Sequence, residues 1–433
     1  MTTHHLAGPL ALILGLSLGA SHASADPIRR SGDVVREWNN SALDAARTTR
    51  ASDAVAARLY AMVNVAMYDA VNGIVGQRGR EREPALVPPK GVPRNGDPVA
   101  AAAAAAHGVL ALAVPSAKAQ LDAQLASDLS TLGMSPSVAA GRNWGDSVAK
   151  QVVAARAADG SSPEEVGPGG AGPGQFRTTW AGAQFRNLAP FAIVDPNAYV
   201  SAGPPSLTSV DYAAAFAEIK LLGNAAIDDP QKLATFQFWS LPAGSDQPPG
   251  AWIQIALAVA ASRSLAVEEA SRLLALVSMA SADTVAPTYM TKFVFNAWRP
   301  ATAIREADTD DNPNTVADPS WAPRGGGIGA NPEHWSGHSI FSAAAATILA
   351  GYFCDDTISF SLRTDSAPGG SARTYPSFSA AAAEAGTSRV IGGVHFEFSN
   401  QAGLAAGQAI AREILVHKLL RRHGPTHFGS CPL

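Results

Sequence analysis

The fold and the chemistry of this chain are decided by three short segments, of which the first is Lys292-Phe-Val-Phe-Asn-Ala-Trp-Arg299-Pro300. The second is Ser336-Gly337-His338, and the third is Ser388-Arg389-Val-Ile-Gly-Gly-Val-His395. Together these segments supply three basic side chains, two imidazoles, a hydroxyl and a glycine N–H. These groups are the donors that a tetrahedral oxyanion such as phosphate or vanadate requires.

The first segment places two basic residues seven positions apart. On one helix seven residues make close to two turns, so we expect Lys292 and Arg299 to project from the same face. Pro300 is expected to end that helix. Taken alone, this spacing is also typical of a solvated basic face.

The second and third segments predict two local turns of the backbone. Ser336 and Gly337 follow a long loop and precede an Ala-rich stretch, which predicts a helix N-terminus whose N–H groups favour anions. Gly392-Gly393 predicts a turn that returns His395 toward Arg389. Taken alone, these residues are more typical of a helix cap, a loop arginine and structural histidines.

The composition around these segments favours a large helical protein. Of the 433 residues, 47% are hydrophobic and 16% are charged, so a sizeable core can form. Long Ala runs favour helix, and alternating β-branched runs are scarce. We therefore predict an all-α fold of helical bundles, in two four-helix-bundle-like units with long Gly/Pro-rich loops. The expected helices are 34–73, 99–132, 137–157, 212–222, 229–239, 251–263, 267–298, 339–352, 378–385 and 402–422, with breaks near Pro115 and Pro287.

The chain is expected to divide into two regions after a leader. Residues 1–25 are typical of a signal peptide, with an apolar stretch from Leu6 to Ala20 and small residues at Ala23-Ser24-Ala25. Residues 26–210 would form an N-terminal helical region, and residues 211–433 a C-terminal bundle that carries the oxyanion site. We expect export to the periplasm or the exterior.

Charge, hydropathy and cysteine content limit the partners. A net charge of −4 disfavours nucleic acid as a partner. No later segment has ~18 consecutive apolar residues, so we expect no stable membrane insertion. Cys354 and Cys431 are the only cysteines, and an exported chain can either oxidise them to a disulfide or keep them apart. Nothing in the sequence indicates an oligomeric state.

The order and spacing of the three segments resemble the signature K-x6-R-P, P-S-G-H and S-R-x5-H of a known superfamily. It comprises the vanadium-dependent haloperoxidases and the type 2 phosphatidic acid phosphatases. Further matching stretches are Asp318-Pro-Ser-Trp321, Arg373-Thr-Tyr-Pro-Ser-Phe, Gly393-Val-His395-Phe-Glu-Phe and Asn400-Gln-Ala-Gly403-Leu. The stretches Trp38-Asn39 and Ala61-Met62-Val63 with Tyr68-Asp69-Ala70 resemble the bacterial, exported, haloperoxidase-like branch.

This resemblance implies a role for each position of the three segments that matches the signature. The oxygens of a bound oxyanion would be held by Lys292, Arg299, Arg389, the Ser336 hydroxyl and the Gly337 N–H. His395 would be the axial ligand to vanadium, or the nucleophile toward phosphorus. His338 would be the acid–base on the opposite side, and Lys292 would also polarise bound peroxide.

Three functions are compatible with such a pocket. The first is a vanadate-dependent peroxidase that uses hydrogen peroxide, a halide and an organic acceptor. The second is an exported acid phosphatase without a cofactor, in which phosphate is the substrate group and His395 becomes phosphorylated. The third is a protein that only binds the oxyanion, and the His338 and His395 pair disfavours it because a binder needs no acid–base. The N-terminal resemblance and the lack of membrane helices favour the peroxidase.

The chain departs from the signature at two positions. Trp335 precedes Ser336, where the signature has Pro, and Asn331 stands where haloperoxidases tend to carry Phe or His near the halide. We therefore expect oxidation of bromide or iodide rather than chloride. His334 is either a further imidazole for the site or a surface loop histidine.

Overall fold

The computed structural model describes Met1 and residues 32–421. Residues 2–25 of the predicted signal peptide and Cys431 lie outside the described residues, so export stays a prediction and both alternatives for Cys354 and Cys431 stay open. Within the described part, helices carry the fold and the strands form two small antiparallel pairs, which confirms the all-α prediction. The α-helices are α1 (Asp33–Thr49), α2 (Asp53–Val75), α3 (Pro98–Ala113), α4 (Lys118–Leu132), α5 (Pro136–Ala155), α6 (Val210–Leu222), α7 (Pro230–Phe238), α8 (Gln247–Ser262), α9 (Val267–Asp283), α10 (Val285–Phe295), α11 (Pro300–Arg305), α12 (Gly337–Phe353), α13 (Phe378–Ile391) and α14 (Glu397–His417).

Short elements connect these helices. Strands β1 (Val166–Gly167) and β2 (Trp180–Ala181) pair within the long irregular stretch that was expected at 159–205. Strands β3 (Phe360–Leu362) and β4 (Arg373–Tyr375) form the second pair. The single-turn elements are Gly76–Arg80, Pro115–Ala117, Ala183–Asn187, Pro196–Tyr199, Ala307–Thr309 and Pro368–Gly370.

Two of the expected long helices are each divided in the structure. The stretch 34–73 breaks into α1 and α2, because Arg50 takes a left-handed conformation and Ser52 caps α2 by accepting a hydrogen bond from Val55. The stretch 267–298 breaks at Thr284, and Pro287 occupies the first turn of α10, where its missing N–H costs no helical hydrogen bond. The predicted break at Pro287 is therefore confirmed, three residues early.

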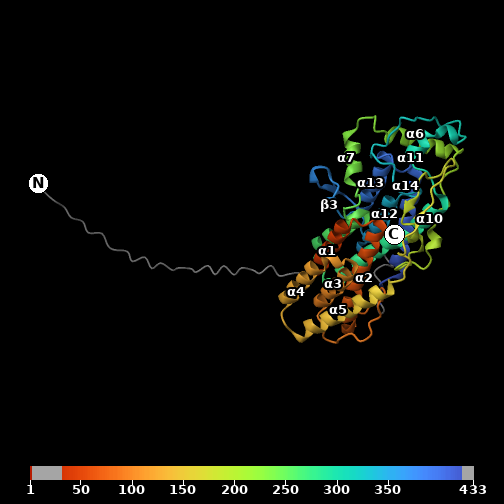
Figure 1. Cartoon of the computed structure of the whole chain (residues 1–433). Helices are drawn as coiled ribbons and strands as arrows, with labels where there is room; N and C mark the ends of the chain where they lie inside the picture. Colours follow the sequence, from red (N-terminus) through yellow and green to blue (C-terminus); the bar gives the residue numbers. More distant parts are fainter. Residues whose placement is uncertain (2–31, 422–433) are drawn as a thin grey trace.

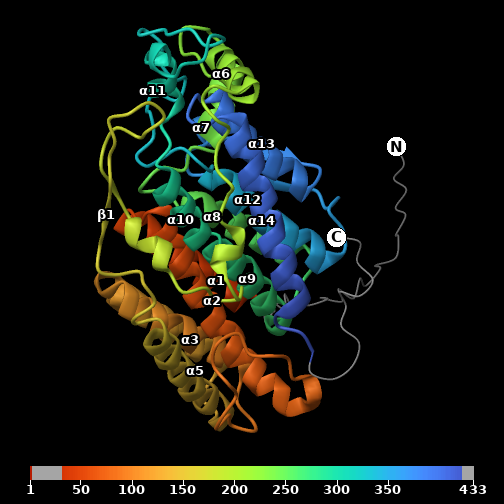
Figure 2. The same cartoon turned by 90° about the vertical axis from the view of Figure 1, so that its right-hand side faces the viewer.

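The helices stack along one long axis of the molecule, with α3 and α5 at one end and α6 and α11 at the other (Figure 2). Helix α2 is buried along nearly its whole length and packs against α3, α5 and α9. Helix α12 is likewise central and packs against α9, α13 and α14. One apolar cluster contains Val63 and Leu276, from both sides of residue 210. The proposed boundary at residue 210 stays a prediction.

The close packing of α14 on α12 fixes the start of α12. A Cβ added to Gly407 would lie 2.3 Å from the Ile340 carbonyl oxygen, so only glycine fits there. A Cβ on Gly403 would lie 2.9 Å from the Ser336 carbonyl oxygen. This contact holds the first turn of α12, and with it the second segment, against α14. Among the residues that the structure describes, no helix combines the length and the apolar content needed to cross a bilayer.

Candidate functional site

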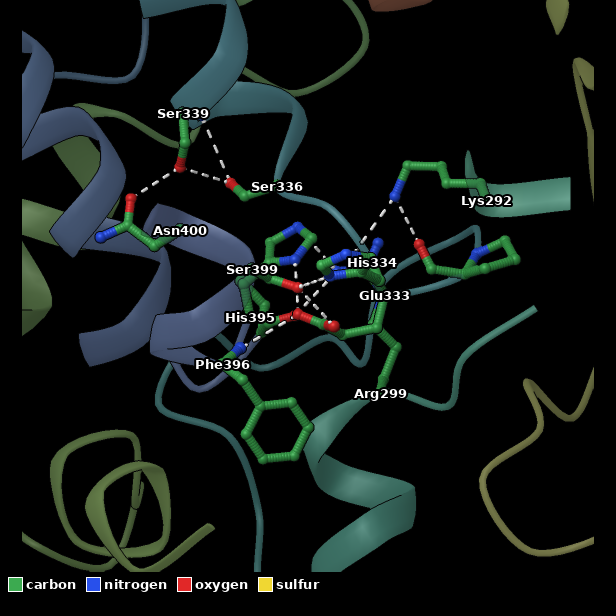
Figure 3. Close-up of polar contacts among 12 residues, drawn as sticks. Lys292, Arg299, Glu333, His334, Ser336, Ser339, His395, Phe396, Ser399 and Asn400 are labelled. Carbon is green, nitrogen blue, oxygen red and sulfur yellow. Dashed lines mark hydrogen bonds and ion pairs between the residues drawn. The ribbon is translucent and has the colours of Figure 1, made fainter. Parts of the chain in front are cut away.

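A cavity of about 300 Å³ brings the three segments together. The chain reaches it from the end of α10, the start of α12 and the turn after α13. The predicted site residues that line it are Lys292, Arg299, Gly337, His338, Arg389 and His395. Ser336 lies beside them but is fully buried. Figure 3 shows Lys292, Arg299, Ser336 and His395 with polar contacts around them.

The first segment reaches the cavity in a different way from the one expected. Lys292 and Arg299 do not share a helix, because Asn296 takes a left-handed conformation and ends α10 at Phe295. Arg299 is instead the residue before α11, and Pro300 begins that helix rather than ending one. The prediction was wrong because a proline with its fixed φ suits the first position of a helix as well as a position beyond its end.

The second segment forms the helix N-terminus that the sequence predicted. Ser336 caps α12, and its Oγ accepts hydrogen bonds from Ser339 N at 3.3 Å and from Ser339 Oγ at 2.8 Å. Gly337 is the first helical residue, and the nearest heavy atom that an added Cβ would meet is Asp53 Oδ2, at 3.6 Å. The backbone of Gly337 is therefore open to the cavity at the positive end of the helix dipole.

The third segment makes the predicted turn. Helix α13 continues to Ile391, six residues beyond its expected end, so Arg389 lies in its last turn. Gly393 has a φ of 76°, and the Val394 N–H donates to the Arg389 carbonyl at 3.1 Å. This reversal directs His395 into the same cavity as Arg389.

The basic side chains of the cavity differ in how many hydrogen-bond partners they have. Arg299 donates to the carbonyl and the side-chain oxygen of Asn331, at 2.8 and 2.9 Å, and to the carbonyl of Val394, at 2.7 Å. Lys292 Nζ donates to the Pro332 carbonyl. Arg389 is buried against the ring of Phe236, and its Nε and Nη1 have no hydrogen-bond partner. Buried guanidinium donors without partners are costly, so an anion with several oxygens fits this cavity.

Crowding of positive charge perturbs the titratable groups. Burial, followed by the charge of Arg299, lowers the pKa of Arg389 to about 9. Burial lowers the pKa of Arg299 to about 10, and burial with the charge of Arg299 lowers the pKa of Lys292. Burial and the nearby cations also hold the pKa of His338 and of His395 well below the usual range. Both imidazoles are therefore neutral near pH 7, and a bound oxyanion would relieve the repulsion among the cations.

Two carboxylates belong to the site and were missed by the sequence reasoning. Glu333 is fully buried, and its Oε1 lies 3.0 Å from His395 Nδ1. Asp53, at the start of α2, lines the cavity and accepts a hydrogen bond from the Tyr289 hydroxyl at 3.2 Å. Glu333 could have been found, because it stands three residues before Ser336. Asp53 had no such signal, because only the packing of α2 brings it to the cavity.

His334 and the two residues that depart from the signature, Trp335 and Asn331, all have structural partners. His334 is 2% exposed, so the alternative of a surface histidine is wrong, but it does not line the cavity. Its ring nitrogens bond the hydroxyls of Ser201 and Ser399, and burial lowers its pKa to about 4. Trp335 is buried and donates to Thr288 Oγ1 at 2.9 Å. Asn331 lines the cavity and orients Arg299.

Comparison with known proteins identifies a similar domain and similar folds. Residues 272–423, which carry all three segments, match the family model described as the VCPO second helical-bundle domain. No curated protein matches the chain. A solved structure described as the first bacterial vanadium-dependent iodoperoxidase is similar over 90% of this chain and 97% of its own, with a TM-score of 0.75 and 20% identity. A bacterial vanadium-dependent chloroperoxidase in its holo form is similar over 84% of this chain and 91% of its own, with a TM-score of 0.63 and 19% identity.

The same chloroperoxidase in its apo form gives a TM-score of 0.64 at 18% identity, over 84% of this chain and 92% of its own. At these identities the structural likeness establishes the fold. Together with the match over residues 272–423, it confirms the resemblance to the vanadium-dependent haloperoxidases that the sequence indicated.

Proposed function

We propose that this chain is a vanadate-dependent peroxidase that oxidises a halide with hydrogen peroxide. The observation that carries the proposal is the unpaired Nε and Nη1 of Arg389, buried beside a cavity that Lys292, Arg299 and His395 also line. A set of donors left open in this way suits an ion with several equivalent oxygens. The likeness to iodoperoxidase and chloroperoxidase structures supports the same chemistry.

Different residues of the cavity would bind the oxygens and the central atom of vanadate. Its oxygens would be bound by Lys292, Arg299, Arg389, Gly337 N–H and Ser336. His395 would be the nitrogen ligand, since its ring lines the cavity and burial keeps it neutral. When bound, vanadate supplies a Lewis-acidic centre at which hydrogen peroxide is activated for attack by a halide.

His338 serves as the acid–base of the reaction. Its Nε2 lies 3.4 Å from the Ser240 carbonyl, which can only accept, so the ring proton sits on Nε2. Burial and the charge of Arg389 keep the ring neutral, so it can take a proton as peroxide loses one and return it later. Lys292 Nζ would donate a hydrogen bond where negative charge develops.

The halide would be bromide or iodide rather than chloride. The side chain of Asn331 accepts a hydrogen bond from Arg299 at the cavity wall, in the place of the Phe or His expected in haloperoxidases. An amide engaged in this way offers neither an aromatic edge nor an imidazole N–H to a small, strongly hydrated chloride. Bromide and iodide are larger and more easily oxidised, so their oxidation depends less on such contacts with the protein.

The test is a comparison of two activities in one preparation. The purified mature chain is loaded with orthovanadate, and peroxide-dependent halogenation of a phenolic dye is measured with iodide, bromide and chloride. Hydrolysis of a generic phosphate ester is measured on the vanadate-free protein. We expect iodide and bromide to be oxidised faster than chloride, with slow ester hydrolysis. Brisk hydrolysis without oxidation of any halide would establish the acid phosphatase instead.

The location of the protein is part of the proposal. The sequence 1–25, which has the pattern of a signal peptide, supports export to the periplasm or the exterior. N-terminal sequencing of the protein recovered from the periplasmic fraction would test this, with cleavage expected before Asp26.

A further inference from the structure

The ring of His395 is held between a group that only accepts and a group that only donates. Its Nδ1 lies 3.0 Å from Oε1 of Glu333, whose carboxylate receives two more donors, from the Phe396 N–H at 3.0 Å and the Ser399 hydroxyl at 2.6 Å. Its Nε2 lies 3.0 Å from Nη1 of Arg299, a guanidinium nitrogen without a lone pair to offer. The proton must therefore sit on Nδ1, and Nε2 keeps its lone pair.

A chain of hydrogen bonds holds Glu333 in turn (Figure 3). Because Ser399 Oγ donates to Glu333, it must accept from Nδ1 of His334, at 2.8 Å. With its proton on Nδ1, His334 accepts at Nε2 from the Ser201 hydroxyl, at 2.7 Å. Ser201 Oγ also accepts from the Gly203 N–H at 3.0 Å, so every donor in the chain has a defined direction.

Every hydrogen bond in this series donates toward Glu333. Three donors surround its two oxygens, namely His395 Nδ1 and the Phe396 N–H at Oε1 and the Ser399 hydroxyl at Oε2. Both oxygens of Glu333 therefore act as hydrogen-bond acceptors in this arrangement. Ser201 is half-buried in the loop before α6, so this end of the hydrogen-bond series lies nearest the surface.

We propose that Glu333 is a positioning residue that fixes His395 in the Nδ1–H tautomer. Nε2, which accepts from Arg299 Nη1 in the structure, thereby keeps a lone pair that the central atom of the oxyanion would take in place of Arg299. Ser399, His334 and Ser201 form the support that fixes Glu333. The proposal rests on the proposed function, because it assigns the lone pair of Nε2 to the vanadate of that same site. A carboxylate behind a ligand histidine orients the ring and raises the basicity of the nitrogen that binds.

The tautomer can be read without vanadate and without activity. Protein labelled with ¹⁵N at the histidine rings gives separate signals for protonated and unprotonated ring nitrogens, and a His395→Gln variant assigns the His395 pair. In the unmodified protein we expect an unprotonated Nε2 and a protonated Nδ1. In Glu333→Gln we expect both tautomers, because an amide can either accept or donate at this position. A wild-type His395 that carries its proton on Nε2 would overturn the proposal.

Vanadate affinity gives the second readout, from equilibrium dialysis of the apo-protein against orthovanadate. We expect Glu333→Gln to raise the Kd about 10- to 100-fold, in keeping with other supports of ligand histidines. Ser399→Ala should raise the Kd less, and Ser201→Ala least, because Ser399 is one hydrogen bond and Ser201 three hydrogen bonds farther from His395 than Glu333 is. The matched control is Glu384→Gln, since Glu384 also receives three donors, from Trp239, Arg373 and Tyr375, but does not line the cavity.

The variants separate positioning from folding and from the proposed activity. If Glu333→Gln does not fold, Ser399→Ala carries the test, because it removes one hydroxyl and should still shift the tautomer balance and the Kd. An unchanged tautomer and an unchanged Kd in a folded variant would refute the proposal. If halide oxidation fails while the tautomer and the Kd respond as expected, the proposed function is wrong and the positioning role stands.

Discussion

Two buried carboxylates, Asp69 in α2 and Glu333 before α12, look alike by burial and by number of hydrogen bonds. Asp69 accepts from the backbone N–H groups of Ala85, Leu86 and Val87, at 2.7, 2.9 and 2.7 Å. Glu333 also has three donors, but one is the ring of His395. The hydrogen bonds of Asp69 fix a loop against a helix, whereas Glu333 orients a side chain that lines a cavity. The kind of group that donates to the carboxylate, rather than its burial, therefore distinguishes a structural acid from a functional one.

A third acid supports this distinction. Asp283, at the end of α9, accepts from the N–H groups of Phe191, Ala192 and Ile193, at 2.6 to 2.8 Å. It repeats the arrangement of Asp69 on helix α9, again with backbone donors alone. Burial raises the pKa of Asp69 to about 7 and that of Asp283 to about 6, while the three N–H groups oppose the shift in each. Both acids stabilise irregular segments that would otherwise have unsatisfied backbone groups.

The largest expected effect is at the residue that Glu333 holds. His395→Ala should raise the Kd for vanadate at least about 100-fold, roughly 2.7 kcal/mol, because it removes the proposed nitrogen ligand. His338→Ala should keep the ion but lower kcat by about 10²- to 10⁴-fold, the range for loss of an acid–base group. Equilibrium dialysis and steady-state kinetics on the two variants would show the split. Equal vanadate affinity in wild type and His395→Ala would contradict the ligand assignment.

The next largest effect should appear in stability, at Asp69. Asp69→Asn leaves backbone N–H groups without an acceptor, so we expect a loss of about 1–3 kcal/mol at pH 5, with the vanadate Kd unchanged. The folded-state pKa of Asp69 lies above its unfolded value, so its stabilisation is complete below about pH 4 and is lost as the pH rises through about 7. The gap between wild type and Asp69→Asn should therefore narrow from pH 5 to pH 8.

Denaturant unfolding at the two pH values would measure this gap. Other buried acids contribute equally to both proteins and cancel in the difference. A gap that widens with pH would mean that the three N–H groups keep Asp69 ionised in the folded state. A weaker vanadate affinity in Asp69→Asn would break the contrast with Glu333.

A smaller effect is expected from Arg389, whose free donors define the oxyanion site. Arg389→Lys replaces a planar fork by a single ammonium, so the affinities for vanadate and for inorganic phosphate should both fall about tenfold. Phosphate should inhibit halide oxidation, and added vanadate should reverse the inhibition, because the two ions share these donors. Inhibition that vanadate fails to reverse would place phosphate elsewhere.

Much of the fold and of the site followed from the sequence, for identifiable physical reasons. Helical periodicity and alanine content predicted the helices, and the glycine pair before His395 predicted its turn. The path of the chain at Arg299 was mispredicted, because a proline is compatible with the end of one helix and the start of the next. The C-terminal limit of α13 was missed by six residues, since local propensity does not register the packing of its last turn.

The two carboxylates of the site show where such reasoning stops. Glu333 lies beside a recognised segment, but its role depends on the direction of a ring 62 positions later in the chain. Asp53 belongs to a helix whose sequence shows no polar pattern beyond a cap. Long-range packing of α2 against the C-terminal bundle creates its position, and no local signal encodes that contact.

The smallest expected effect is at Asp53, which tests whether an acid on the cavity wall weakens binding of the oxyanion. Its Oδ2 is the nearest atom to the open side of Gly337, and its charge is felt by Lys292. Asp53→Asn removes one negative charge and keeps an acceptor for the Tyr289 hydroxyl. At an effective dielectric near 40, suited to a cavity open to solvent, one charge about 8 Å away is worth about 1 kcal/mol, so phosphate and vanadate should each bind roughly fivefold more tightly. Raised salt should shrink the gain if Asp53 acts through its charge. Isothermal titration with phosphate would measure it, and weaker binding in Asp53→Asn would mean that the acid instead positions a donor for the ion, as Glu333 does for His395.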